Sequence, residues 1–310
     1  MTPQPSNGVS RTLERMLLKS ADDRGADVRA LEALRTRPGL DVRTWRAIDD
    51  EIWSIRLGAK AEADAAYQLD FDLRDSKHWV VIHDLRIDLE GLIAQIDHLV
   101  ISRLLEVFVC ESKSYTGGVK VNDRGEWSTY RDRRPIGIPS PVEQNRRHIA
   151  VLEEVIKRGY IELPRRIVAL RPTFKNIVLV SAGGLITRPR KQLPELDSVV
   201  KVDQFRTYLA DREFPDRQML KLVGSETIER LGRQLVALHR PANFDWAARF
   251  GQMAPKEPAG TEQALPARRP WLVKFDGTCS NSGTVLTKGT EAIWRQRERQ
   301  MLCLDCGAAR

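Results

Sequence analysis

The sequence has little cysteine and no long apolar run. Its four cysteines, at positions 110, 279, 303 and 306, are too few and too unevenly spread to form a disulfide framework in a chain of 310 residues. No segment approaches the roughly 20 consecutive apolar residues that a membrane-spanning helix needs, and residues 1–20 lack the apolar core of a signal peptide. We therefore expect a cytoplasmic protein without a membrane partner.

Neither sign of charge is scarce, although basic residues are in excess. The 50 Lys and Arg residues against 42 Asp and Glu give a formal net charge of +8, and hydrophobic residues make up 42% of the chain. This hydrophobic fraction is sufficient for a packed core, so the composition indicates a soluble globular protein. The basic excess favours a polyanionic partner such as nucleic acid.

The composition changes along the chain and predicts four segments. Residues 1–48 are highly charged, with Leu13, Met16, Leu17, Val28, Leu31 and Leu34 at helical spacing, and predict a helical extension. Residues 49–250 predict the main domain. Residues 251–270 are rich in Pro, Gly and charge, which is typical of a linker, and residues 271–310 then form a separate small module.

The main domain alternates helical and strand patterns, which predicts the mixed α/β class. Three β-like runs at 79–88, 94–101 and 105–113 are separated by short turns and predict an antiparallel meander. Helices are expected over residues 58–73, 141–158, 204–211 and 225–239, and further strands over residues 176–181 and 199–203.

The last strand of the meander changes from apolar to charged along one face. Because side chains alternate across a strand, Leu105, Val107 and Val109 share a face with Glu111 and Lys113. Asp97 interrupts the corresponding face of the preceding strand, and pairing through the short turn brings it near Glu111. His98 and Cys110 alternate to the other face, where we expect His98 to pack or hydrogen-bond and Cys110 to act as a small buried hydrophobe.

These residue types suit phosphodiester hydrolysis. Asp97 and Glu111 offer the hard oxygen ligands that Mg²⁺ takes, and Lys113 would position the attacking water and stabilise charge on the scissile phosphate. Glu62, on the preceding helix, would add a metal ligand or orient the water. Gln144, on the following helix, would hydrogen-bond water or substrate.

The order of these motifs resembles a known family. It runs from G-x-x-x-E (Gly58 to Glu62) through QIDHLVI with Asp97 and E-S-K (Glu111 to Lys113) to P-x-x-Q (Pro141 to Gln144). This order is similar to that of the nuclease-related domain, NERD, of the PD-(D/E)xK superfamily, over roughly residues 50–158. The resemblance implies a restriction-endonuclease-like core with a mixed central sheet flanked by helices, dependence on Mg²⁺ or Mn²⁺, and a role in DNA processing.

Two positions depart from the expected pattern. His148 stands where the Q-x-x-x-Y helix of related nucleases has Tyr, and the turn at 102–104 lacks the glycine expected there.

Two functions are compatible with this pattern. The first is a metal-dependent nuclease, and the second is a nucleic-acid-binding protein that keeps the fold without cutting. Glu111 and Lys113 could also form no more than a surface ion pair, which contributes at most about 1 kcal/mol. The nuclease is favoured because a binding module has no need for carboxylates such as Asp97 and Glu111, which repel phosphate.

The last segment resembles a zinc ribbon. Cys303 and Cys306 form one C-x-x-C-G knuckle, whereas the other has Cys279 but Ser282 in place of its second cysteine. We expect either a zinc site of three thiolates completed by water or an outside ligand, or a degenerate ribbon held by packing. Its basic and aromatic residues suit either nucleic-acid contact or a solvated surface: Arg268, Arg269, Trp271, Lys274, Trp294, Arg295, Arg297 and Arg299.

Overall fold

The chain is described by a computed structural model that covers most of its length. The described residues are 17–115, 117–131, 134–210, 222–251, 271–273, 275–295 and 300–308. The chain divides into two compact units, one of Met1–Thr36 with Ile48–Ala247 and one of Arg37–Ala47 with Ala248–Arg310. The predicted linker lies outside the described residues from position 252 onward. None of the described helices combines the length and the apolarity needed to cross a bilayer.

A six-stranded mixed sheet forms the centre of the first unit. Its order is β1-β2-β3-β4-β8-β10. The strands are β1 (Leu17–Lys19), β2 (Trp79–Leu89), β3 (Leu92–Ser102), β4 (Glu106–Lys113), β8 (Thr173–Val180) and β10 (Val199–Lys201). Strands β2, β3 and β4 pair antiparallel, which confirms the predicted meander, and β1, β8 and β10 add parallel to β2, β4 and β8.

The N-terminal extension is only partly helical. Helix α2 (Gly25–Arg35) confirms the predicted helix around Leu31, but the helix expected through Leu17 is wrong, because Leu17 lies in β1. The Lys19 ammonium donates hydrogen bonds to the carbonyls of His83 and Asp84, which holds β1 on β2. Leu13 and Met16, which were also predicted to be helical, lie outside the described residues.

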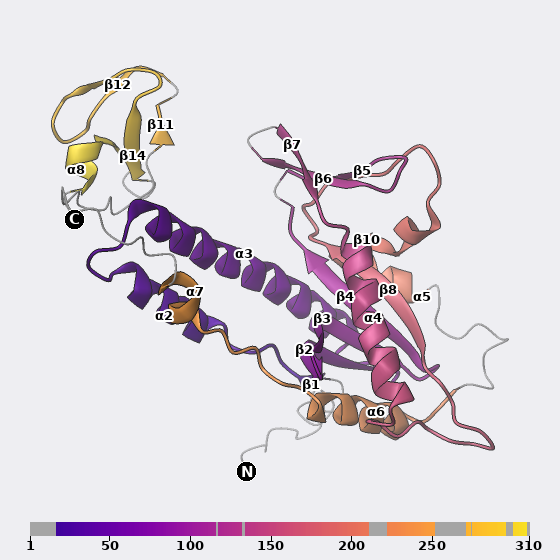
Figure 1. Cartoon of the computed structure of the whole chain (residues 1–310). Helices are drawn as coiled ribbons and strands as arrows, with labels where there is room; N and C mark the ends of the chain where they lie inside the picture. The colour runs from indigo at the N-terminus through magenta and orange to yellow at the C-terminus, as the bar shows by residue number, and fades with distance from the viewer. Residues whose placement is uncertain are drawn as a thin grey trace, which may run out of the picture. The chain divides into compact units, whose positions relative to one another are not determined.

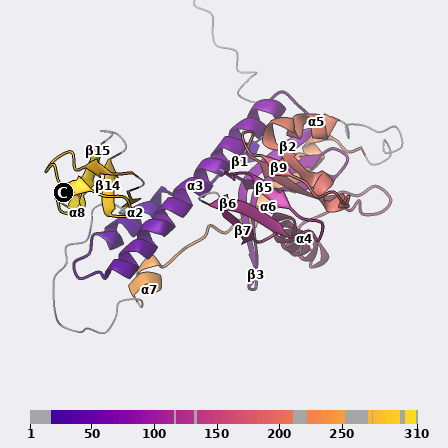
Figure 2. The same ribbon diagram turned by 90° about the horizontal axis from the view of Figure 1, so that it is seen from above.

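Helices cover both faces of the central sheet (Figure 1), so the predicted α/β class is confirmed. Residues of α3 (Val42–Leu73) and α5 (Phe205–Ala210) pack with Phe108 and Leu179 on one face. Residues of α4 (Pro141–Lys157) and α6 (Ser225–Ala237) pack with Leu99 and Val109 on the other. Helix α3 starts well before the predicted position 58 and continues unbroken to Leu73 (Figure 2). The remaining short helical segments are η1 (Pro194–Ser198), η2 (Val202–Gln204) and α7 (Trp246–Gly251).

Helix α4 is fixed at its start and to the sheet beneath it. The Ser140 hydroxyl accepts a hydrogen bond from the Glu143 N–H, and Pro141 occupies the first turn, where its missing N–H costs nothing. Asn145 is fully buried, and its amide donates to the carbonyls of Val109 in β4 and Ile177 in β8, at 3.0 and 2.7 Å. This anchor sets the position of α4 relative to the strand that carries Glu111.

A second, four-stranded sheet consists of short strands that were not predicted from the sequence. It has the order β7-β6-β5-β9. The strands are β5 (Val119–Val121), β6 (Trp127–Arg131), β7 (Arg134–Ile138) and β9 (Ile186–Thr187). Val119, Val121 and Trp127 are buried under it, so these short strands form because the apolar residues have a common core to pack into.

The C-terminal unit contains the small module. It comprises β11 (Trp271–Leu272), β12 (Gly277–Thr278), β13 (Val285–Leu286), β14 (Glu291–Arg295), β15 (Gln300–Cys303) and α8 (Leu304–Ala308). Strands β11, β14 and β15 pair antiparallel, as do β12 and β13. Their core is a handful of apolar side chains around Ile293 and Leu302, together with Cys279.

Candidate active site

Asp97 and Glu111 lie side by side at the end of the β3–β4 pair. The register places His98 opposite Cys110, so the preceding residue of β3 faces the following residue of β4. The Asp97 Oδ2 accepts two hydrogen bonds from Ser112, at 2.8 Å from its N–H and 2.9 Å from its hydroxyl. Neither bond uses Oδ1. The Asp97 carboxylate is therefore oriented by β4 while one of its oxygens is left for another ligand.

Lys113 pairs with one oxygen of Glu111. Its Nζ lies 2.5 Å from Oε1, whereas Oε2 is buried without a hydrogen-bond partner among the described residues. Glu111 is 1% exposed, and burial together with the charge of Asp97 raises its pKa to about 7, against the lowering effect of Lys113. Although burial opposes the charged form of Lys113, the neighbouring carboxylates raise the pKa of its ammonium.

Glu62 of α3 belongs to the same electrostatic cluster. Burial, followed by the charges of Asp97 and Asp84, raises its pKa to about 7. The oxygens of Glu62, Asp97 and Glu111 do not all lie within 4.8 Å of one another, since the described residues hold only the cysteine group discussed below at that spacing. The carboxylates therefore interact through their charges, and the three are not all gathered at the 4.8 Å spacing.

Gln144 and His148 lie one helical turn apart on α4. The Gln144 side chain is half-buried and makes no hydrogen bond to the described part of the chain, so its role stays a prediction. His148 is buried, and its Nε2 lies 3.9 Å from Oε2 of Glu111. Burial, followed by the charges of Arg147 and Lys113, lowers the pKa of His148 to about 4, so the imidazole is neutral near pH 7.

Asp84 is a site residue that the sequence analysis missed. It has the left-handed φ of +50°, and its carboxylate accepts hydrogen bonds from the Gln95 amide and the Asp22 N–H. Its charge acts on both Glu62 and Asp97. The signal in the sequence is an acidic residue inside the apolar run that starts at Trp79. His148, which the sequence analysis noted only as a departure from the Q-x-x-x-Y pattern, is a polar residue on the apolar stripe of α4.

His98 is buried in a chain of polar groups, so the prediction that it packs or hydrogen-bonds is confirmed. Its Nδ1 is 2.8 Å from Nδ1 of His83, and Nε2 of His83 is 3.1 Å from Oδ1 of Asp70 in α3. Cys110 is fully buried, and burial raises the pKa of its thiol, so the prediction that it acts as a small hydrophobe is confirmed.

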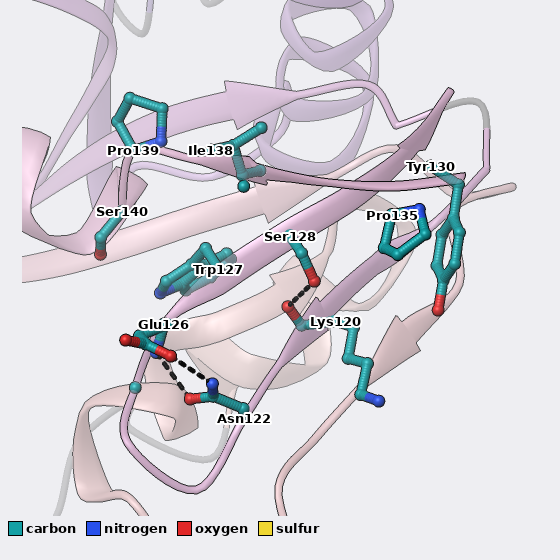
Figure 3. A pocket seen from close by; sticks show the side chains of 12 residues that line it. Lys120, Asn122, Glu126, Trp127, Ser128, Tyr130, Pro135, Ile138, Pro139 and Ser140 are labelled. Atoms are coloured by element: carbon teal, nitrogen blue, oxygen red, sulfur yellow. Dashed lines mark hydrogen bonds between the residues drawn. The ribbon is translucent and has the colours of Figure 1, made fainter. Parts of the chain in front are cut away.

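Two cavities lie in the first unit. One, of about 720 Å³, lies on the small sheet, where Lys120 and Tyr130 border it near the buried Trp127 (Figure 3). It ends at Ser140, the residue that caps α4. The other, of about 570 Å³, lies between α2 and α3, and Glu62 lines it together with three arginines, Arg24, Arg29 and Arg56.

Three cysteines of the C-terminal module form a second candidate site. The Sγ atoms of Cys279, Cys303 and Cys306 all lie within 4.8 Å of one another. Ser282 adjoins them, with its N–H 3.5 Å from Sγ of Cys279 and its Oγ 3.6 Å from Sγ of Cys303. The hydrogen bond from Ser282 is the largest cause that lowers the pKa of Cys279 to about 5. This group could hold a metal ion.

Most of the basic residues noted for this module lie outside the described residues. They are Arg268, Arg269, Lys274, Arg297 and Arg299, and the side chains of Trp271 and Arg295 are likewise not described. Trp294 is 44% exposed and therefore does not belong to a closed core.

A mixed sheet between helices, with an aspartate on one strand and E-x-K on the next, is the arrangement of the PD-(D/E)xK class. Residues 57–179 match the family model of the nuclease-related domain, NERD, which confirms the predicted resemblance over this part of the chain. The match contains all five predicted residues and extends to β8. Comparison with curated proteins and with solved structures gave no match.

Proposed function

We propose that this protein is a metal-dependent nuclease that hydrolyses phosphodiester bonds in DNA. The observation that carries the proposal is the convergence of four carboxylates, from Glu62, Asp84, Asp97 and Glu111, with the Lys113 ammonium at the end of β4. Groups whose charges raise one another's pKa are unfavourable for folding by themselves, and such groups gather at functional sites.

The donor set fits Mg²⁺ or Mn²⁺. Both ions take carboxylate oxygens, and Asp97, Glu111 and Glu62 would supply them, with the rest of the shell from water and phosphate. The Lys113 ammonium at Oε1 of Glu111 marks a position where a cation is favourable. When bound, such an ion offers Lewis acidity and lowers the pKa of a coordinated water.

The protein's own residues then have distinct roles. Ser112 orients Asp97, and Asp97 and Glu111 hold the site on adjacent strands. The ammonium of Lys113 is free to leave Glu111 for the scissile phosphate, where it stabilises developing negative charge. Gln144 would contact water or substrate from the first turn of α4.

Substrate binding is supported by charge. The net charge of +8 favours a polyanion, and the arginines beside Glu62 (Arg24, Arg29 and Arg56) can approach phosphates near the site.

Cleavage by purified protein tests the proposal directly. Plasmid and linear DNA are incubated with Mg²⁺, Mn²⁺ or EDTA, and we expect cleavage only with a divalent ion. Glu111→Gln should abolish cleavage while DNA binding persists or tightens, because a charge that repels phosphate is lost. Lys113→Ala should keep most of the metal affinity but lower turnover by on the order of 100-fold or more.

The other end of β4 offers matched controls. Glu106, the first residue of β4, pairs at 3.2 Å with Lys175 of the adjacent strand β8, so Glu106→Gln and Lys175→Ala remove a similar glutamate and lysine at the opposite end of β4 from Glu111. Both controls should cut normally. A wild type that binds DNA and never cuts would instead establish the binding protein, and equal cleavage by Lys113→Ala would refute the catalytic assignment.

We also propose that the C-terminal module binds zinc through Cys279, Cys303 and Cys306. Zn²⁺ prefers thiolate ligands in tetrahedral geometry, and the three thiols are already gathered. With only three protein ligands, the ion should be held more weakly than in a site closed by four.

A further inference from the structure

His148 faces an oxygen of Glu111 that no other described group holds. Oε2 of Glu111 and both ring nitrogens of His148 are buried without a hydrogen-bond partner in the described chain. Buried polar atoms are nearly always paired, because leaving them unpaired forfeits their hydration. Three unpaired atoms in one place therefore indicate an interaction that forms when the site is in use.

We propose that His148 is a positioning residue, which donates a hydrogen bond from Nε2 to Oε2 of Glu111 and thereby holds Oε1 toward the metal. This inference rests on the proposed function and deepens it. The separation of 3.9 Å must close by about 1 Å to make the bond, which a rotation of the carboxylate can supply when the ammonium of Lys113 leaves Oε1.

The surrounding structure keeps His148 at this distance. Asn145, one turn earlier on α4, donates to the carbonyl of Val109, two residues before Glu111 on β4. The helix and the strand are therefore tied together next to the pair. Carboxylates that ligate metals are themselves commonly hydrogen-bonded through their second oxygen, and loss of such a partner typically costs 10- to 100-fold in metal affinity.

The tautomer of the His148 ring follows from the group that its Nε2 faces. Nε2 faces a carboxylate oxygen, which is an acceptor, so the neutral ring carries its proton there. Nδ1 is then an acceptor, and an unpaired acceptor is tolerated better than an unpaired N–H.

The test is Mn²⁺ binding to the full-length protein without DNA, measured by calorimetry on the wild type, His148→Phe and His148→Gln. His148→Phe fills the space but donates nothing, and should weaken Mn²⁺ binding by roughly 10- to 100-fold. His148→Gln can place its amide N–H near the position of Nε2, and should stay within about threefold of the wild type. A merely structural role would not distinguish these variants in this way.

Val151→Ala is the matched control, since Val151 is buried in the core on the same helix but lies outside the carboxylate cluster. It should lower the melting temperature and leave Mn²⁺ affinity unchanged. Mn²⁺ binding by His148→Phe equal to that of the wild type would overturn this inference alone. Loss of Mn²⁺ but not Mg²⁺ affinity in His148→Gln would overturn it too, by making His148 a nitrogen ligand. If the wild type binds no Mn²⁺ beyond what Glu111→Gln also binds, both this inference and the proposed function are refuted.

Discussion

At the scale of single residues, the raised pKa values of Glu62 and Glu111 link folding to pH. Both values lie near 7, whereas the unfolded carboxyls titrate near 4.5. Between these two values the folded state binds more protons than the unfolded state, so stability falls as pH rises through this window. A divalent ion favours the ionised carboxylates and should offset this loss.

Thermal melts in EDTA at pH 5 and pH 8 check this expectation by comparing the wild type with Glu111→Gln. Because the amide does not ionise, the variant should lose less stability than the wild type between pH 5 and pH 8. The difference between the two losses should be at least about 1 kcal/mol, or roughly 2–4 °C in melting temperature. Mn²⁺ should raise the melting temperature of the wild type more at pH 8 than at pH 5. An identical pH response of the two proteins would contradict the raised pKa of Glu111.

Ser282 is the residue that decides the strength of the cysteine site. Its N–H and hydroxyl adjoin two of the three sulfurs, so Ser282→Cys would add a fourth thiolate and close the site. Zinc affinity, measured by competition with a chromophoric chelator, should rise by on the order of tenfold or more. Ser280→Cys is the matched control, because that exposed residue adds a thiol on the same turn, where no hydrogen bond to the three sulfurs is seen among the described residues. An equal rise in zinc affinity in both variants would contradict a defined position for a fourth ligand at residue 282.

At the scale of elements, the buried chain from Asp70 through His83 to His98 links α3 to β2 and β3. His83 is 2% exposed and is bonded at both ring nitrogens, whereas Asp70 is half-exposed. Replacing His83 by Ala leaves His98 unpaired in the core and opens a cavity. We expect a loss of about 2–4 kcal/mol in the free energy of unfolding, measured by chemical denaturation.

Asp70→Ala should cost less than half as much, because water can reach its position and replace the carboxylate. A larger loss from Asp70→Ala than from His83→Ala would show that the bond to α3, rather than the buried histidine pair, holds these elements together.

The elements predicted from sequence were those with a clear period. The meander of β2, β3 and β4 and the apolar stripe of α4 followed from alternation and helical spacing, and the motif order placed Glu62, Asp97, Glu111 and Lys113 in one region. The sheet of β5, β6, β7 and β9 was missed, because strands of two to five residues carry too few alternations to show a period. Leu17 was assigned to a helix since its neighbours had helical spacing, but pairing with β2 determines its conformation.

The site was predicted less completely, for a physical reason. Asp84 and His148 act through contacts between elements that are distant in sequence, and their own segments are otherwise apolar. Only the folded chain shows that the charge of Asp84 raises the pKa of Glu62, or that His148 lies 3.9 Å from Glu111.

At the scale of the whole molecule, the two candidate metal sites belong to separate compact units and share no ligand. The carboxylates lie in the first unit and the cysteines in the second. The two sites also differ in chemistry, since hard oxygens suit Mg²⁺ and Mn²⁺ whereas thiolates suit Zn²⁺.

The net charge of the whole chain predicts how DNA binding responds to salt. Each phosphate neutralised by a basic group releases counterions, so a contact with three or more phosphates should lower affinity by at least about tenfold between 50 and 200 mM salt. Glu111→Gln allows this measurement without cleavage, by fluorescence anisotropy of a labelled duplex in EDTA.

Two arginine variants locate the DNA on the protein. Arg24→Ala and Arg56→Ala should each lower the slope of log affinity against log salt concentration by up to about the contribution of one phosphate contact, because both arginines line the cavity beside Glu62. Lys60→Ala, which removes an exposed charge of α3 outside that cavity, is the control. An affinity that does not change with salt would exclude phosphate contacts as the main source of binding, and a slope unaffected by either arginine would place the DNA elsewhere on the protein.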